Sequence, residues 1–195
     1  CLAQNFRKLH SIRFPSFGNL MNRGTISPPG FINFIDRYQE VNDMILNLCK
    51  QKKCFNQSEF IKLSDFIQNK FTVLRAALDI QCRPATLVIT DMHGGNFHVF
   101  HNSVSGFFDV ESSQSAPLEF ELYCMRLFIF NFFGAKEFAL AESAFWKAYC
   151  GCSTPDIKSS EIIDFFSFLR IVELCQSYWG YTDGIRDNWG KNMKA

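Results

Sequence analysis

Two acidic residues and an asparagine lie in a short central segment, at a spacing that suits phosphoryl transfer. Asp91 begins and Asn96 ends the sequence Asp-Met-His-Gly-Gly-Asn, and Asp109 follows the mostly apolar residues 104–108. Phosphoryl transfer needs a carboxylate to orient the attacking hydroxyl and oxygen ligands for the Mg²⁺ that accompanies the nucleotide phosphates. We expect Asp91 to be the base that accepts the hydroxyl proton, and Asn96 and Asp109 to be the metal ligands.

Short apolar runs on either side of the loop would bring these side chains together. Residues 86–89 are β-forming and predict a strand that ends just before Asp91. Residues 97–100 and 104–108 flank the turn-forming sequence His-Asn-Ser, which predicts a β-hairpin. This hairpin would return Asp109 to the side of Asn96, so that both side chains could bind one metal ion.

These residues resemble the aminoglycoside phosphotransferase family, which includes choline-kinase-like and homoserine-kinase-like small-molecule kinases. Its members carry His-Gly-Asp-Leu-His-Pro-Gly-Asn, a hairpin and then Ile-Asp-Phe-Glu; this chain has Ile-Thr-Asp-Met-His-Gly-Gly-Asn at 89–96 and Phe-Asp-Val-Glu at 108–111. Residues 116–122 are similar to the family's Pro-Pro-Glu-Phe-Asp-Leu helix start, with Glu121 where Asp is usual. Residues 2–10, which end in Leu-His, are similar to the helix that opens the family's C-terminal lobe.

The resemblance implies transfer of the ATP γ-phosphoryl group to a hydroxyl of a small polar molecule, with Mg²⁺ as cofactor. It assigns catalysis to Asp91 and metal binding to Asn96 and Asp109, and it places His93 with them near the nucleotide phosphates. The family's His-Gly pair before the catalytic Asp is Ile-Thr here. The alternative is therefore a non-catalytic, pseudokinase-like binding or regulatory module.

Residues 1–195 are expected to form a single domain, the C-terminal lobe of a kinase-like phosphotransferase. The sequence contains neither the Gly-rich phosphate-covering loop nor the strand lysine of an N-terminal nucleotide lobe. We therefore expect that lobe to be absent from this chain, and the chain alone to be an inactive part of the enzyme. The aromatic tail at 179–189 could line the acceptor pocket or pack over the lobe.

Helical periodicity dominates the rest of the chain, and a stretch rich in Gly and Pro at 13–30 predicts a long loop. Helices first, a small β insertion and then more helices predict a mainly helical α+β fold. This is the order expected of a protein-kinase-like C-terminal lobe whose small β-hairpin insertion carries the catalytic and metal-binding loops. The predicted helices are 1–12, 31–52, 58–80, 118–133, 136–149 and 160–179.

A simpler structural role stays open for each site residue. Asp91 could cap its own loop by accepting backbone N–H groups, and Asn96 could be a turn residue. Asp109 could pair with an arginine, because a carboxylate at the end of an apolar strand is costly unless it is paired or metal-bound. His93 could position the loop, and a zinc site made with the other two histidines nearby would lack a fourth ligand.

The composition argues against several other classes of protein. A hydrophobic content of 47% and a charged content of 20% indicate a folded domain, and a net charge of +1 gives no basic excess for nucleic-acid binding. No apolar run approaches the length of about 18 residues that a membrane helix needs. The eight cysteines lack a Cys-x-x-Cys spacing, so we expect free thiols and a cytoplasmic location. The expected partners are a nucleotide and a small hydroxyl acceptor, with no nucleic acid or membrane; the acceptor's identity and the oligomeric state are not indicated.

Overall fold

The computed structural model describes residues 1–21, 24–129 and 134–180. Within them the fold is α+β, mainly helical with two small antiparallel sheets, which confirms the coarse fold class predicted from the sequence. The α-helices are α1 (Leu2–Leu9), α2 (Phe34–Gln51), α3 (Gln57–Leu74), α4 (Glu119–Cys124), α5 (Gly134–Cys150) and α6 (Ile157–Gly180). The strands are β1 (Gly18–Asn19), β2 (Thr86–Ile89), β3 (Phe97–Phe100), β4 (Ser103–Phe107) and β5 (Ser113–Ala116). Short turns of other helix types are η2 (Ala76–Leu78), η3 (Val110–Ser112) and the π-helical η4 (Met125–Ile129).

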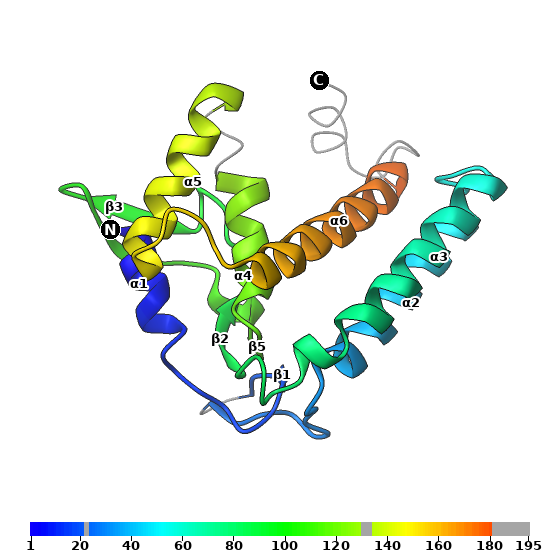
Figure 1. The fold of residues 1–195 in the computed structure, drawn as a ribbon, viewed down its shortest axis with the longest axis horizontal. Helices are drawn as coiled ribbons and strands as arrows, with labels where there is room; N and C mark the ends of the chain where they lie inside the picture. Colours follow the sequence, from blue (N-terminus) through cyan, green and yellow to red (C-terminus); the bar gives the residue numbers. More distant parts are fainter. Residues whose placement is uncertain (22–23, 130–133, 181–195) are drawn as a thin grey trace.

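The small three-stranded sheet lies low in the view of Figure 1, with helices above it and on either side. The hairpin of α2 and α3 forms one side of the molecule, and α6 runs between this hairpin and α4. On the other side α1 packs against α5, close to the β3–β4 hairpin. No helix in the described residues has both the length and the apolar character needed to cross a membrane.

Local polar side chains define where the α2–α3 hairpin begins. The Asn33 side chain accepts a hydrogen bond from the Ile35 backbone N–H at 3.0 Å and so caps α2. At the start of α3, Asn56 and Glu59 form a capping box, with reciprocal backbone-to-side-chain bonds of 2.9 and 3.0 Å. These caps satisfy N–H groups that the first turn of a helix leaves without partners.

A cluster of aromatic rings joins three helices and the N-terminal loop. Phe34 of α2 is fully buried, and its ring centroid lies 5.4 Å from Phe17, 4.9 Å from Phe120 of α4 and 5.7 Å from Phe166 of α6. These edge-to-face contacts are a favourable arrangement for aromatic pairs. The Phe-rich helical segments therefore supply the core.

The sheet order β1-β5-β2 contains two strands that the sequence did not predict. β1 lies inside the predicted loop 13–30, so that prediction was wrong for Gly18–Asn19. β5 pairs antiparallel with both β1 and β2, with Ile89 opposite Ser113. The predicted bounds of β2, 86–89, are confirmed.

Three predicted helices end differently in the structure. The helix predicted for 1–12 ends at Leu9. The helix predicted for 58–80 ends at Leu74 and continues as the short η2 turn. The helix predicted for 118–133 is instead the short α4, followed by η4 with a wider helical turn. Residues 130–133 and the aromatic tail from 181 onward lie outside the described residues, so the tail's predicted role stays a prediction.

Candidate functional site

The loop that carries Asp91 is anchored to the structure at its first residues. The Thr90 hydroxyl donates to the carbonyl oxygen of Ser112 at 2.9 Å, and the Cys124 thiol donates to the Thr90 carbonyl at 3.3 Å. Met92 is fully buried, while Asp91 between them is partly exposed. The loop is therefore held by β2, by the segment before β5 and by α4, and Asp91 stays partly exposed in it.

Asn96 closes the loop back onto Asp91. Its side chain is 5% exposed, and its Nδ2 donates to the Asp91 carbonyl oxygen at 2.6 Å. Its backbone N–H donates to the carbonyl oxygen of His93 at 3.0 Å. The structural role that the sequence left open for Asn96 is thus real. It uses the amide nitrogen, so the oxygen Oδ1 remains as the atom that could bind a ligand.

The β3–β4 hairpin brings Asp109 back to this loop, as predicted. Phe97 pairs with Phe107, and one residue further along the Phe108 N–H donates to the Asn96 carbonyl oxygen at 2.8 Å. Asp109 is the next residue in the chain. The backbones of Asn96 and Asp109 therefore lie side by side, although 12 other residues separate them in the sequence.

Asp109 does not lie in the environment that the sequence suggested. It is exposed, and the preceding Phe108 is 54% exposed, so the expected cost of burying this carboxylate was wrong. Among the ion pairs of the described residues, none involves Asp109 or Asp91. The Asp109 backbone has φ 55° and ψ 44°, a left-handed conformation that is strained for a residue with a side chain. Such conformations occur preferentially at functional sites, and here the left-handed residue ends the extended chain that follows β4.

His93 holds the loop in shape. Its Nδ1 accepts a hydrogen bond from the Gly95 backbone N–H at 3.1 Å. A Cβ atom on Gly95 would lie 3.0 Å from His93 Cε1, so the ring packs directly over this glycine. Because Nδ1 is an acceptor here, Nε2 is the ring nitrogen left to meet a phosphate or solvent.

The metal site stays a prediction. Within the described residues no group of three or more His, Cys, Asp or Glu side chains is placed to hold a metal. The predicted set is one amide oxygen and one carboxylate, from Asn96 and Asp109. The zinc alternative would have used His98, which is instead exposed and hydrogen-bonded to the Ser105 hydroxyl at 2.8 Å.

A buried acid fixes the strand that leads to the loop. Glu121 of α4 is fully buried, and its Oε1 accepts from the Ile89 backbone N–H at 3.1 Å, two residues before Asp91. Its Oε2 forms a hydrogen bond with Nε2 of His10, the residue that follows α1, and His10 Nδ1 is hydrogen-bonded to the Tyr149 hydroxyl at 2.6 Å. Burial raises the pKa of Glu121, and the bonds from His10 and Ile89 oppose this shift.

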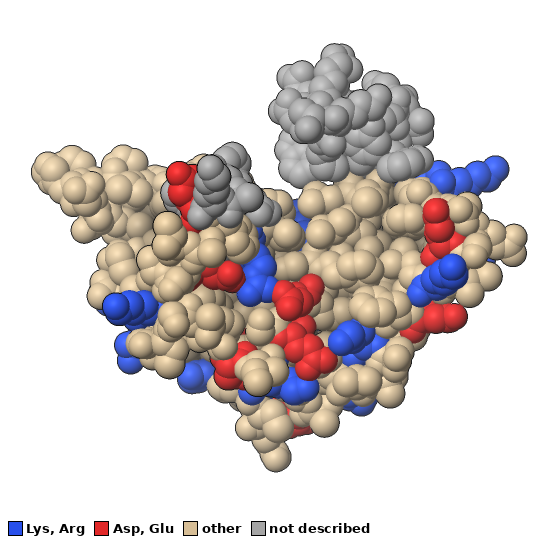
Figure 2. Space-filling model, turned by 45° about the horizontal axis from the view of Figure 1, so that its top comes forward, with Lys and Arg blue, Asp and Glu red and all other residues tan. Residues whose placement is uncertain are grey.

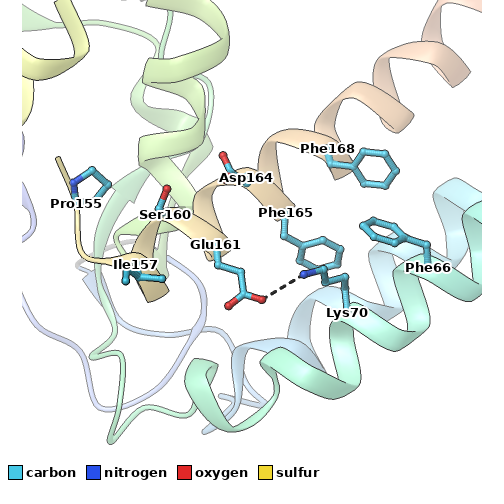
Figure 3. A pocket seen from close by; sticks show the side chains of 9 residues that line it. All are labelled: Phe66, Lys70, Pro155, Ile157, Ser160, Glu161, Asp164, Phe165 and Phe168. Carbon is cyan, nitrogen blue, oxygen red and sulfur yellow. Dashed lines mark hydrogen bonds and ion pairs between the residues drawn. The ribbon is translucent and has the colours of Figure 1, made fainter. Parts of the chain in front are cut away.

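The site lies apart from a groove that opens between α3 and α6 (Figure 3). The groove has a volume of about 790 Å³, and the Lys70–Glu161 ion pair of 3.2 Å crosses it. At one end Phe66 and Phe168 meet edge to face, with ring centroids 5.2 Å apart. The residues that line it are Phe66, Lys70, Pro155, Ile157, Ser160, Glu161, Asp164, Phe165 and Phe168. None of these is a predicted site residue, so this groove was not predicted from the sequence.

Charged side chains of both signs are interspersed over the face shown in Figure 2. Several form pairs: Arg126 contacts Glu142 at 2.8 Å and also pairs with Asp164 of α6. In α6, Lys158 adds a second lysine contact to Glu161 at 2.7 Å. The absence of nucleic-acid partners stays a prediction from the net charge.

Comparison with known proteins identifies no relative. No protein-family model, no curated protein and no solved structure matches this chain. The function is therefore argued from the chemistry and geometry of the residues described above.

Sequence reasoning noted Glu121 and His10 separately but missed the contact between them. The available signal was an acid inside the otherwise apolar sequence Leu-Glu-Phe-Glu-Leu-Tyr, where a buried carboxylate needs a partner. The partner lies 111 residues away in the sequence, directly after α1. Helix α4 also carries Glu119, which is 1% exposed and accepts from Arg83 at 2.8 Å. Both acids of this helix are therefore buried and paired.

Proposed function

We propose that this chain is the C-terminal lobe of a cytoplasmic small-molecule kinase of the aminoglycoside phosphotransferase type. It would transfer the γ-phosphoryl group of ATP to a hydroxyl of a small polar acceptor. The observation that supports this is the pair of hydrogen bonds made by Asn96. The side-chain Nδ2 of Asn96 donates to the Asp91 backbone carbonyl oxygen at 2.6 Å. The backbone carbonyl oxygen of Asn96 accepts from the N–H of Phe108 at 2.8 Å, and Asp109 is the next residue.

In the proposed reaction Asp91 acts on the acceptor. Its carboxylate accepts a hydrogen bond from the acceptor hydroxyl and takes the proton as the hydroxyl oxygen attacks the γ-phosphorus. The bond from the γ-phosphorus to the bridging oxygen breaks, and ADP leaves. The loop anchors at Thr90 and Met92 hold the carboxylate in place, and its partial exposure leaves room for a substrate.

The residues near Asp91 fit a magnesium ion by their chemistry. Mg²⁺ prefers oxygen ligands and commonly takes one or two from the protein. Asp109 offers an exposed carboxylate, and Asn96 offers Oδ1, because its Nδ2 is already used. When bound, the ion would neutralise charge on the transferring phosphates. His93 would present Nε2 toward the same phosphates, since its Nδ1 is occupied by Gly95.

The test is acceptor-dependent ATP turnover by the full-length protein that contains this chain, measured with a panel of amino alcohols, sugars and amino acids. Asp91→Ala should lower kcat by about two to four orders of magnitude while ATP binding is largely retained, because only the proton acceptor is lost. Asp109→Ala should also weaken binding of Mg²⁺–ATP. Asp65→Ala on the exposed face of α3 is the matched control and should keep wild-type turnover. Unchanged ATP turnover in both site variants would refute the assignment.

The second candidate is a non-catalytic binding or regulatory module with the same lobe. The groove of about 790 Å³ between α3 and α6 favours it, because none of the residues proposed for catalysis lines this groove. The Ile-Thr sequence before Asp91 points the same way. A full-length protein that binds ATP or a small ligand but consumes no ATP with any acceptor would support this candidate.

A further inference from the structure

The end of α2 places two cysteines in contact through a defined backbone motif. The Cys54 N–H donates to the Cys49 carbonyl oxygen at 3.0 Å, and the Lys53 N–H donates to the Lys50 carbonyl at 3.2 Å. Lys53 between them has a φ of 53°. This pair of bonds around a left-handed residue is a Schellman motif, in which the first and last side chains usually meet in an apolar contact. Here these two side chains are both thiols.

The two thiols are buried at the two ends of this motif. Cys49 is fully buried and Cys54 is 9% exposed. The Cys49 thiol donates to the Val172 carbonyl oxygen of α6 at 3.8 Å. The motif brings the side chains at its first and last positions together, and a disulfide needs their Cβ atoms about 3.5–4.5 Å apart. Closing the bond would therefore turn the Cys49 sulfur from Val172 toward Cys54.

The surroundings of the pair are basic. Lys50, Lys52 and Lys53 occupy the turn between the two cysteines, and Lys50 and Lys53 are exposed. Lys52 lies close enough to lower the pKa of both thiols, against the larger effect of burial. Such a turn attracts a small anionic disulfide, of which glutathione disulfide is the common cellular example.

We propose that Cys49 and Cys54 are a thiol pair that glutathione disulfide oxidises to an intramolecular disulfide. The less buried Cys54 attacks as the thiolate, forms a mixed disulfide and releases one glutathione thiolate. Cys49 then loses its proton and displaces the second glutathione, which leaves the Cys49–Cys54 bond. The protein gives up two protons and two electrons, and glutathione disulfide is reduced to two glutathione molecules. This inference does not depend on the proposed kinase activity.

Burial sets the rate of this reaction. It raises the pKa of Cys49 to about 12 and also raises that of Cys54. The reactive thiolate is therefore scarce at neutral pH, and the rate should increase by about tenfold for each unit of pH between 7 and 9. Cys175 of α6 lies near the pair and provides a competing partner for Cys54.

The experiment is peptide mapping after exposure of the folded chain to glutathione disulfide. Trypsin cuts after Lys50 and Lys53, so a Cys49–Cys54 bond links two separate peptides, 38–50 and 54–62. We expect this linked pair, a loss of about 2 Da for the bond and its disappearance on reduction with dithiothreitol. Cys175→Ser should still form it.

Two outcomes would overturn the proposal, and a third would overturn the role of the basic turn. The first is that peptides 38–50 and 54–62 stay unlinked at pH 9 while the exposed Cys152 becomes glutathionylated. The second is that Cys54 becomes linked to the peptide of Cys175 instead. The third concerns charge: Lys50→Gln should slow closure by glutathione disulfide more than closure by the neutral bis(2-hydroxyethyl) disulfide, and equal slowing of both would refute the role of the basic turn.

Discussion

Replacement of Glu121 tests how the strand before Asp91 is held. Glu121→Ala removes the acceptor of the Ile89 N–H, 3.1 Å away, and the partner of His10 Nε2. His10 is only 3% exposed, so water cannot readily replace the carboxylate. The substitution also leaves a cavity where the carboxylate was. Each of these effects destabilises the folded state and leaves the unfolded state largely unaffected.

The magnitude follows from breaking a buried pair. Removing one partner of a buried ion pair costs about 3–5 kcal/mol, and an unsatisfied buried donor accounts for about 1–3 kcal/mol of such losses. We therefore expect Glu121→Ala to lower the free energy of unfolding by about 3–5 kcal/mol. Glu121→Gln keeps an oxygen for Ile89 and gives His10 Nε2 an N–H donor. His10 Nδ1 can then donate to the Tyr149 hydroxyl, so this variant should lose only about 1–2 kcal/mol.

The assay is equilibrium urea unfolding followed by tryptophan fluorescence. With an m-value of about 3 kcal/mol/M, the midpoint of Glu121→Ala should fall by about 1–1.7 M, and that of Glu121→Gln by about 0.3–0.7 M. An alanine variant whose midpoint stays within about 0.3 M of wild type would refute the reasoning. So would equal losses for alanine and glutamine, because the hydrogen bonds would then contribute nothing beyond the charge.

Two further predictions concern local structure. Hydrogen bonds from the Ser159 N–H and hydroxyl to the Asp156 carboxylate, at the start of α6, lower the pKa of Asp156. The carboxylate therefore stabilises the folded state above its ordinary pKa of about 4, and this stabilisation is lost as the pH falls through the lowered pKa. In thermal unfolding Asp156→Ala should therefore cost about 1 kcal/mol at pH 7 and less at pH 2, and an equal cost at both would contradict this. Gly95→Ala should lower the free energy of unfolding in urea by about 0.5–1.5 kcal/mol, because the added Cβ would lie 3.0 Å from His93. Gly94→Ala is the control, since its Cβ would meet open space, and equal losses for both variants would exclude the His93 contact as the cause.

The parts of the site that form through interactions between neighbouring residues were predictable from the sequence. Val88 and Ile89 are β-formers and lie in β2 as predicted. The hairpin turn contains His101 and Asn102, both with positive φ, a conformation that Asn tolerates better than most residues. Because the hairpin is closed by neighbouring residues, its return to the loop followed from the sequence alone. The class of fold followed in the same way from helical periodicity.

Other features depended on contacts between distant segments. Gly18–Asn19 and Ser113–Ala116 are short and mostly small or polar, so their own sequences do not favour strands. They become strands because β5 offers hydrogen bonds to β1 on one side and to β2 on the other. Strand pairing of this kind depends on register and on neighbours far along the chain, which periodicity does not report.

The sequence by itself determined which residues could do chemistry and that the hairpin would return Asp109 to the side of Asn96 and the loop of Asp91. Tertiary structure alone decided their surroundings: Asp109 is exposed in a strained backbone, and β2 is held by Glu121, which lies 32 residues further along the chain. The physical reason is the distance along the chain over which each kind of interaction acts. Turn and strand preferences act over a few residues, whereas burial and the partners of buried charges depend on the packing of the whole domain.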